Sequence, residues 1–426
     1  MSSERIIEVA TLPDKIETGA TYSIAQKNPN FYTHGMFKYP CKFIPEIPRW
    51  GINSFLSNNK QTVFDPFAGS GTTLLEANIC GYNAYGTEID EVAKLITKVK
   101  TTKLKKAELA KVDALYNNIL VLLDGKKKST YRPQINNLEH WFSEETINDL
   151  GLIKEFIDDI DNVSIKNFFS VVFVSIIKRV SFADDTSPKP YVSNNIKKNP
   201  PSVEKEFASV FNRYRMMIED LLQASRLGST QLIEGDALSF HTKRHFDIAI
   251  SSPPYINAFD YGRTMRLENL WLGLIDEDSL REKKAFYVGT EKIKIKSEEE
   301  DLLILGKSSL LEEYYRGVEK EDKKRALIVK RFFEDMEKNM QCVYSHLKPN
   351  SKYMIVIGNS SIRNIEIESW KVLEQIGQTI GFETNQYFNY EIKNPYIRIP
   401  RGGKGGKISK DYIIVLEKGD IDGAKR

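Results

Sequence analysis

The chain has 426 residues, which is enough for two or three domains of average size or for one large α/β domain with insertions. Hydrophobic residues make up 41% and charged residues 28% of the sequence, a composition that is typical of globular proteins and excludes extensive disorder. The net charge of only +3 excludes a general electrostatic attraction to nucleic acid, so any such affinity must come from local basic patches.

Cysteines, histidines and apolar runs exclude further classes. Cys41, Cys80 and Cys342 are too few and too scattered for a disulfide framework or a zinc site. The five histidines show no metal-binding spacing, so we expect no metal. The first residues contain no apolar run typical of a signal peptide, and the longest apolar stretch, 168–177, reaches about half of a membrane span. We therefore expect a cytoplasmic protein with no membrane partner.

Six apolar runs, rich in β-branched residues, predict strands. Helical patterns at 72–79 and 91–100 separate the early strands, and a turn signal at 348–350 precedes the fifth. Because strands that alternate with helices form βαβ units, we expect an α/β fold with a doubly wound, mostly parallel sheet and helices on both faces. The six predicted strands are 62–64, 83–89, 230–233, 246–250, 353–357 and 412–416.

Two segments interrupt this alternation. Residues 101–227 are mostly helical in pattern and predict a helical insertion, and residues 276–322 are strongly charged and predict a solvated helical insertion within the core. The remaining parts, 1–100 and 228–426, then form one discontinuous core domain.

A glycine-rich turn links the first of these strands to its helix. Gly69 and Gly71 allow a tight turn with positive φ, so that the backbone can approach a ligand closely. The helix that begins near Thr72 directs its free N–H groups at the same place. About twenty residues later Glu88 ends the second strand, where a carboxylate can bind the ribose hydroxyls of a nucleoside. The alternative is a turn that only links strand to helix.

The residues after Gly71 narrow the choice of nucleoside. A dinucleotide fingerprint needs glycine where Leu74 stands, and a P-loop needs lysine where Thr72 stands. A loop with Asp65 and few groups for binding phosphate fits a cationic, phosphate-free nucleoside such as S-adenosylmethionine. The predicted cofactor-binding residues of this region are Asp65, Phe67, Gly69, Ser70, Gly71, Thr72 and Glu88.

Two other segments fit the same cofactor. Asp236 follows the third strand and could accept a hydrogen bond from an adenine amino group, although the same residues also fit a simple strand-ending turn. The aromatic and proline-containing block 37–43 precedes the first strand, and it could equally be a hydrophobic cap on the sheet.

The turn Ser252-Pro253-Pro254-Tyr255 ends the fourth strand, at the sheet edge where open α/β folds bind ligands. The two prolines stiffen the chain and donate no backbone hydrogen bonds. The Ser252 hydroxyl and the backbone carbonyls can then accept hydrogen bonds, and Tyr255 can stack on a ring. This arrangement suits a planar base with an exocyclic amino group, whose nitrogen could attack the methyl group of the cofactor directly.

Together these motifs resemble those of the S-adenosylmethionine-dependent amino-methyltransferases that act on DNA bases. Residues 256–261 and 270–273 are similar to a prokaryotic subfamily, and block 39–45 resembles the cofactor-proximal motif, which would place Phe43 near the methionine moiety. The resemblance implies a Rossmann-like methyltransferase fold with a seven-stranded sheet. A leading serine, as in Ser252, goes mostly with methylation of cytosine at N4.

The resemblance also implies partners. We expect double-stranded DNA with a specific recognition sequence as the substrate, in a prokaryotic restriction-modification or defence system with a cognate restriction endonuclease. The helical segment 101–227 is the candidate target-recognition region. Candidate DNA contacts are Arg263 and Arg266, for which pairing with Glu268 is the alternative, and Arg401, Lys404 and Lys407 of a glycine-rich segment that could equally be a solvated hairpin loop.

Several competing activities are considered. Methylation of cytosine at carbon 5 would need a Pro-Cys nucleophile after the fourth strand, where Ser252 stands, and Cys41 precedes the first strand. Adenine-N6 methylation uses the same chemistry and remains the first alternative. Methylation of RNA or tRNA is a second, although no appended RNA-binding module is evident. A nucleic-acid-binding protein with an inactive pocket is the non-enzymatic alternative.

Overall fold

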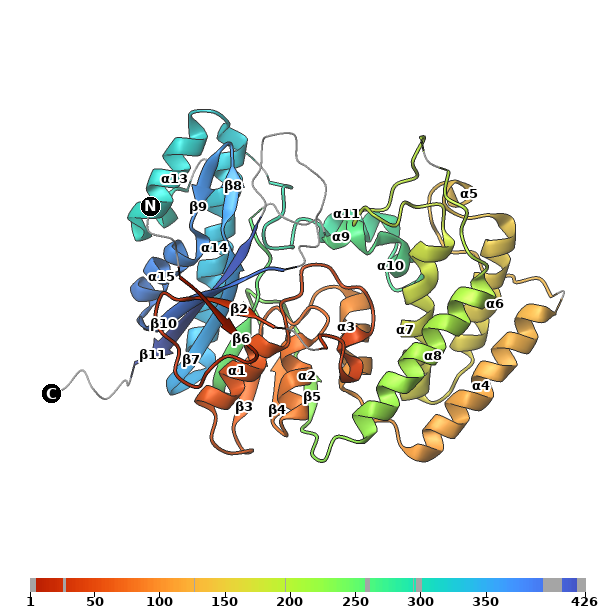
Figure 1. The fold of residues 1–426 in the computed structure, drawn as a ribbon. Helices are drawn as coiled ribbons and strands as arrows, with labels where there is room; N and C mark the ends of the chain where they lie inside the picture. Colours follow the sequence, from red (N-terminus) through yellow and green to blue (C-terminus); the bar gives the residue numbers. More distant parts are fainter. Residues whose placement is uncertain are drawn as a thin grey trace.

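The computed structural model describes residues 5–25, 28–125, 127–195, 197–256, 261–293, 295, 301–393 and 408–419. Within them the main sheet has nine strands in the order β1-β2-β10-β11-β7-β6-β3-β4-β5, and β8 and β9 form a separate hairpin (Figure 1). All pairs of the main sheet are parallel except those that β11 makes with β10 and β7. The strands are β1 (Ile6–Val9), β2 (Thr21–Ile24), β3 (Thr62–Asp65), β4 (Asn83–Gly86), β5 (Thr230–Leu232), β6 (Phe246–Ser251), β7 (Leu347–Gly358), β8 (Ser360–Ile362), β9 (Ile365–Ile367), β10 (Phe382–Glu391) and β11 (Lys410–Lys418).

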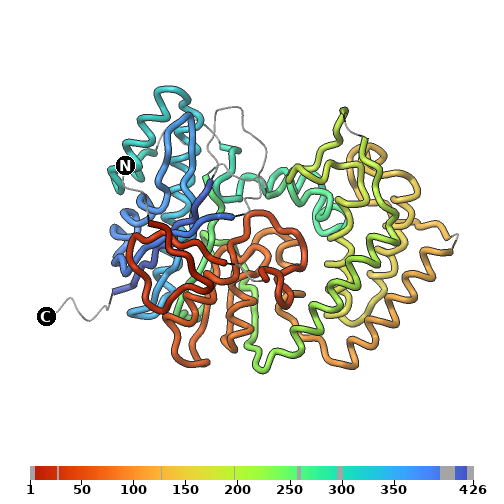
Figure 2. Tube along the Cα trace, viewed as in Figure 1, coloured from red at the N-terminus to blue at the C-terminus, as the bar shows by residue number. Residues whose placement is uncertain are grey.

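All six predicted strands are present, as β3, β4, β5, β6, β7 and β11. β10 completes the expected seven strands, and its many polar residues explain why no apolar run marks it in the sequence. The sheet is larger than predicted because β2 pairs with β10 and β1 pairs with β2, which places the amino-terminal segment beside the last strands (Figure 2). The exposed residues of the predicted turn at 348–350 are part of β7, but the strand is irregular there, because its register with β6 shifts and Asn350 has φ +60°.

Helices cover both faces of the sheet because side chains alternate along the central strands. On β7, Met354 and Val356 pack in the core with α1 and α2. Tyr353 and Ile355 point to the opposite face, where they pack with α14 and α15. The helices of these two layers, together with the elements that adjoin them, are η1 (Tyr32–Gly35), α1 (Glu46–Phe55), α2 (Thr72–Ile79), α3 (Glu91–Thr101), η2 (Leu303–Lys307), α13 (Ser309–Glu319), α14 (Lys323–His346) and α15 (Ser369–Ile380).

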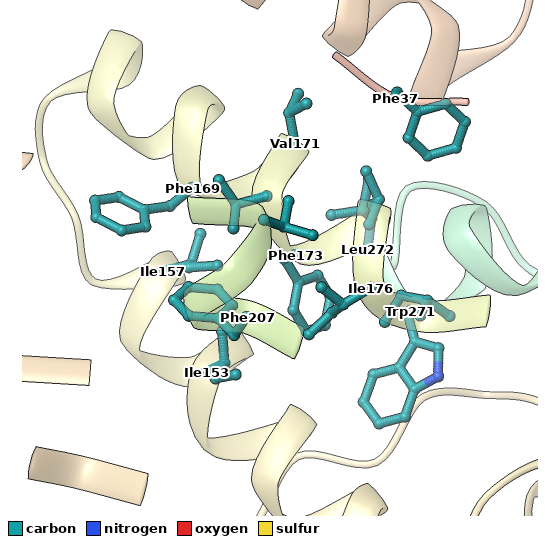
Figure 3. Close-up of a cluster of buried hydrophobic side chains, with 14 of the residues drawn as sticks. Phe37, Ile153, Ile157, Phe169, Val171, Phe173, Ile176, Phe207, Trp271 and Leu272 are labelled. Carbon is teal, nitrogen blue, oxygen red and sulfur yellow. The ribbon is translucent and has the colours of Figure 1, made fainter. Parts of the chain in front are cut away.

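Within its described residues, the expected helical insertion forms five helices. They lie beside the sheet (Figure 1). Its core contains Phe169 and Phe173 of α7 and Phe207 of α8 (Figure 3). The same core includes Phe37 and Trp271, which lie outside the helical segment. This shared core joins the helical segment to the sheet domain. The five helices are α4 (Lys106–Asp124), α5 (Leu138–Trp141), α6 (Glu144–Asp158), α7 (Val163–Val180) and α8 (Val203–Leu222).

The charged segment 276–322 is less solvated than the sequence predicts. After α9 (Tyr261–Thr264) and α10 (Arg266–Leu272), it contains α11 (Glu277–Lys283), η2 and α13. Leu280, Val288 and Leu311 are buried, because the apolar residues between its charges pack against the sheet domain. None of the helices in the described ranges is long and apolar enough to cross a membrane.

Candidate active site

A cleft lies where the carboxyl ends of β3, β4 and β6 meet, as expected for ligand binding in an open parallel sheet. It contains about 780 Å³ of space, part of which is open to solvent. Both predicted halves of the site reach this one cleft. The predicted residues that line it are Phe43, Phe67, Gly69, Ser70, Thr72, Glu88, Asp236, Ser252 and Pro254.

The glycine turn has the conformation that the sequence predicts. Gly69 has φ +51° and Gly71 has φ +78°, backbone conformations that residues other than glycine rarely adopt. A Cβ atom on Gly71 would lie 2.8 Å from Oγ1 of Thr97 on α3. The same Thr97 hydroxyl donates a hydrogen bond of 3.0 Å to the Gly69 carbonyl, so α3 fixes the turn from behind.

Ser70 provides a test of whether this cleft suits a polar ligand. Its side chain is buried at the cleft, and within the described residues its hydroxyl has no hydrogen-bond partner. A buried hydroxyl without a partner is unfavourable unless a ligand or water satisfies it. The cleft therefore offers a polar group where a cofactor would bind.

Asp65 and Gly71 do not line the cleft. Asp65 is buried behind the turn and accepts a hydrogen bond of 3.0 Å from the backbone N–H of Phe67. Burial raises the pKa of its carboxyl to about 6. In this structure Asp65 supports the turn from beneath.

Glu88 links the ends of β3 and β4. Its carboxylate accepts hydrogen bonds from the backbone N–H groups of Gly69 (2.7 Å), Ile89 (2.8 Å) and Asp90 (2.8 Å). Burial raises the pKa of Glu88 to about 7, and the negative charge of Asp90 also raises it. A carboxylate offers about four lone-pair positions, so about one remains for a ligand in this arrangement.

Asp236 lies across the cleft from the glycine turn, after β5. One carboxylate oxygen accepts hydrogen bonds from the N–H groups of Leu238 and Ser239, each at 2.8 Å, and from the Ser239 hydroxyl at 3.2 Å. In the part of the chain that the structure describes, the other oxygen has no hydrogen bond. This oxygen is available to an amino group of a ligand, as the sequence predicts.

The Ser252–Tyr255 turn follows β6 directly. Ser252 and Pro254 line the cleft, whereas Pro253 and Tyr255 do not. The Tyr255 hydroxyl donates a hydrogen bond of 2.5 Å to Asp411, which also accepts one of 2.7 Å from Tyr390. Burial and the negative charge of Asp411 raise the pKa of Tyr255 well above its usual value.

Sequence reasoning missed a row of tyrosines along the cleft. The rings of Tyr39 and Tyr261 stack at a centroid distance of 6.0 Å, and those of Tyr261 and Tyr287 stack at 6.4 Å. The Tyr287 hydroxyl donates to Asp90 at 3.2 Å. Tyr39 and Tyr261 lie in blocks that carry the family resemblance, but Tyr287 lies in the charged segment, where no motif indicates it.

Comparison with known proteins agrees with this geometry. Residues 4–99 match the family model of N6 and N4 methyltransferases, described as DNA methylase. This part of the chain is therefore similar to DNA methylases. The predicted resemblance to the DNA amino-methyltransferases is thereby confirmed.

Known methyltransferases are similar to more than half of the chain. Type II methyltransferase M.MvaI of Kocuria varians is 26% identical over 86% of the chain and 85% of its own length. M.BsoBI of Geobacillus stearothermophilus is 27% identical over 60% of the chain and 56% of its own length. Among solved structures, a SAM-dependent methyltransferase from Methanosarcina mazei is 9% identical with a TM-score of 0.29, over 86% of this chain and 96% of that one.

The candidate DNA contacts Arg263 and Arg266 differ in exposure and in pairing. Arg263 lies exposed on α9. Arg266 forms an ion pair with Glu277 of α11 and lies 5.5 Å from the ring centre of Trp141, so it pairs with an acidic residue, as the alternative allowed, but with Glu277 and not with Glu268. Glu268 is buried instead, which raises its pKa to about 7. Arg401, Lys404 and Lys407 lie outside the described residues. No metal-binding cluster of His, Cys, Asp or Glu is present within those residues.

Proposed function

We propose that the protein transfers a methyl group from S-adenosylmethionine to the N4 amine of cytosine in DNA. The observation that supports this most directly is that one cleft is lined by both Glu88 of the glycine-turn half and Ser252 of the Ser-Pro-Pro-Tyr half. A methyl donor and a flipped base would then lie next to each other, as direct transfer requires.

S-adenosylmethionine, when bound, supplies an electrophilic methyl group on a sulfonium. Glu88 would hold the ribose through its remaining lone-pair position, and the free oxygen of Asp236 would accept from the adenine amine. Ser70 would donate its buried hydroxyl to a polar atom of the cofactor. Tyr39, Tyr261 and Tyr287 present aromatic rings along the cleft, and aromatic faces attract cations.

The Ser252 turn prepares the base for methylation. Its hydroxyl can donate to the ring nitrogen beside the target amine, and backbone carbonyls of the turn can accept from the amine itself. Accepted hydrogen bonds draw the amine lone pair out of conjugation with the ring. The bound cofactor would supply its methyl group to this nitrogen and leave as the neutral thioether, and the methylated amine would lose a proton to solvent. No covalent bond to the protein forms.

The choice of cytosine rests on the first residue of the turn. A serine hydroxyl can donate to cytosine N3, whereas an ionised aspartate at this position could only accept. Adenine N1 offers a similar acceptor, so adenine-N6 methylation is the second candidate. The larger purine would need a wider slot between Tyr255 and the methyl donor.

The setting we propose is a restriction-modification or defence system in a prokaryotic cytoplasm. The matched relatives are named Type II methyltransferases, which supports double-stranded DNA with a specific recognition sequence as the substrate and a cognate endonuclease as a partner. The helical segment 101–227 is the proposed target-recognition region. Arg263, Arg401, Lys404 and Lys407 are the proposed phosphate contacts, and Arg266 would first have to leave Glu277.

Incubation with labelled cofactor and DNA, followed by mass spectrometry of the nucleosides, tests this proposal. We expect N4-methylcytosine. Ser252→Ala should lose most turnover and keep its affinity for the cofactor. Ser345→Ala changes an exposed serine on α14 and should leave both turnover and cofactor affinity unchanged. Detection of N6-methyladenine alone would contradict the choice of cytosine and leave the chemistry intact. Absence of any methylated base would overturn the function.

A further inference from the structure

Asp411 is a buried carboxylate that no sequence motif indicates. It is the second residue of β11, and 6% of it is exposed. Its two oxygens accept hydrogen bonds from two different tyrosines, Oδ1 from Tyr255 at 2.5 Å and Oδ2 from Tyr390 at 2.7 Å. Hydrogen bonds to a carboxylate are stronger than those between neutral groups, so these contacts constrain both rings.

The strand register brings these groups together. Asp411 lies opposite Gly358 on β7 and opposite Tyr390 on β10. Tyr255 follows the end of β6, which pairs with β7 on the side opposite to β11, and its side chain reaches the same place. The carboxylate of β11 therefore connects β10 with the turn that follows β6, at the end of the sheet where β6 ends.

The Tyr255 ring has little room to move. A Cβ atom on Gly358 would lie 2.8 Å from Cε2 of this ring, so the ring packs directly over the glycine backbone. On the other side, a Cβ atom on Gly289 would lie 2.9 Å from the Tyr255 carbonyl oxygen. Two glycines thus allow close packing around Tyr255, and Asp411 fixes the free end of its side chain.

We propose that Asp411 is the positioning residue that holds the Tyr255 ring at the angle needed to stack on the target base. This inference rests on the proposed function, in which Tyr255 contacts the base. Asp411 itself contacts neither base nor cofactor and acts only through Tyr255. Tyr390 occupies its second oxygen and keeps the carboxylate from turning away.

The test compares Asp411→Ala, Asp411→Asn, Tyr255→Phe and the double variant Asp411→Ala/Tyr255→Phe in the full chain, with kcat and KM measured separately for DNA and for S-adenosylmethionine. Asp411→Ala should lower kcat/KM for DNA by about tenfold or more, the effect of one hydrogen bond to a charged group, and change cofactor KM by less than about twofold. Asp411→Asn keeps an acceptor of the same shape and should restore part of the activity.

The double variant distinguishes positioning from a general structural effect. Asp411→Ala and Tyr255→Phe remove the same hydrogen bond, so the double variant should be about as active as Asp411→Ala alone. Tyr353→Phe is the matched control, because it removes another buried tyrosine hydroxyl, bonded to Asn339 at 2.7 Å, away from the turn. It should leave kcat/KM for DNA within about twofold of the unaltered protein.

Each remaining outcome is decisive. Losses that multiply in the double variant, or equal losses in Tyr255→Phe and Tyr353→Phe, would overturn the positioning role while the methylation activity stands. If Asp411→Ala does not fold, full activity of Tyr255→Phe and Asp411→Asn would overturn it as well. Failure of the unaltered protein to methylate DNA would overturn the proposed function and, with it, this role of Asp411.

Discussion

The cofactor half and the base half of the cleft are held in place in different ways. In the cofactor half, Thr97 fixes Gly69 and Glu88 accepts from the backbone of Gly69, and all of these residues lie in the consecutive elements from β3 to α3. In the base half, Tyr255 depends on Asp411, which is 156 positions away along the chain. The glycine turn of the cofactor half is therefore built from one local unit, whereas the position of Tyr255 in the base half needs the pairing of distant strands.

This difference has a consequence for how changes in one half affect the other. Contacts that are local in sequence can form before distant strands pair, because closing a short loop costs less entropy. Substitutions in the base half should then spare cofactor binding. Substitutions in the glycine turn should reduce cofactor binding even where the rest of the sheet is intact.

The largest expected effect is that of Glu88→Ala. It should weaken binding of S-adenosylmethionine by about 1.5–3 kcal/mol, the range for hydrogen bonds to a charged acceptor. Isothermal titration calorimetry measures this directly. Glu144→Ala is the control, since Glu144 pairs only with Arg132 at the surface of the helical segment and its loss should leave binding unchanged. Unchanged affinity in Glu88→Ala would remove Glu88 from the cofactor half.

Tyr255→Ala tests the separation from the other side. Loss of base stacking should cost about 1–3 kcal/mol in kcat/KM for DNA. Cofactor affinity should change little, because the side chain of Tyr255 contacts Asp411 and Gly358, and neither of these residues belongs to the glycine turn. Steady-state kinetics with each substrate varied in turn would measure both. A collapse of cofactor affinity with normal turnover at saturating cofactor would mean that the two halves are wrongly divided.

Gly71→Ala tests how the glycine turn is built. The new Cβ would meet Thr97 at 2.8 Å and would stand at φ +78°, which should lower the free energy of unfolding by about 1–2 kcal/mol. Gly306→Ala is the matched control, since nothing lies within 4 Å of a Cβ atom there, and its effect should be close to zero. Denaturant unfolding compares the two variants. Equal stabilities would show that the turn does not need glycine at this position.

The smallest expected effect is a pH dependence of cofactor binding. With the pKa of Glu88 raised to about 7, the ionised fraction rises between about pH 6 and pH 8, so affinity should increase by at most about tenfold over this interval. Stability should change in the opposite direction. A raised pKa in the folded state favours folding at low pH, and this contribution is lost as pH rises from about 4.5 through about 7. Glu88→Gln should lose the rise in cofactor affinity, and its loss of stability with rising pH should be smaller, because Asp65 and Glu268 also have raised pKa values.

Much of the fold followed from the sequence because its signals are local. The runs that became β3, β5, β6 and β11 are apolar and short, and the helix predicted at 72–79 coincides with α2. β10 escaped prediction because polar residues interrupt its apolar ones. β2 escaped because one of its partner strands, β10, is far along the chain, and β1 pairs only onto β2 among the described strands. The predicted solvation of 276–322 failed for a related reason, since charges conceal the apolar residues that pack against α14.

The sequence by itself determined the chemistry of this protein. The two glycines and the carboxylate at the end of the second predicted strand form a turn whose hydrogen bonds involve only residues that are near in sequence. Tertiary structure alone decided which distant groups complete the site. Asp411 reaches Tyr255 through strand pairing, and Tyr287 reaches Asp90 through packing of the charged segment. No local pattern encodes these contacts, because they arise from the order of strands in the sheet and from burial against surfaces that the fold creates.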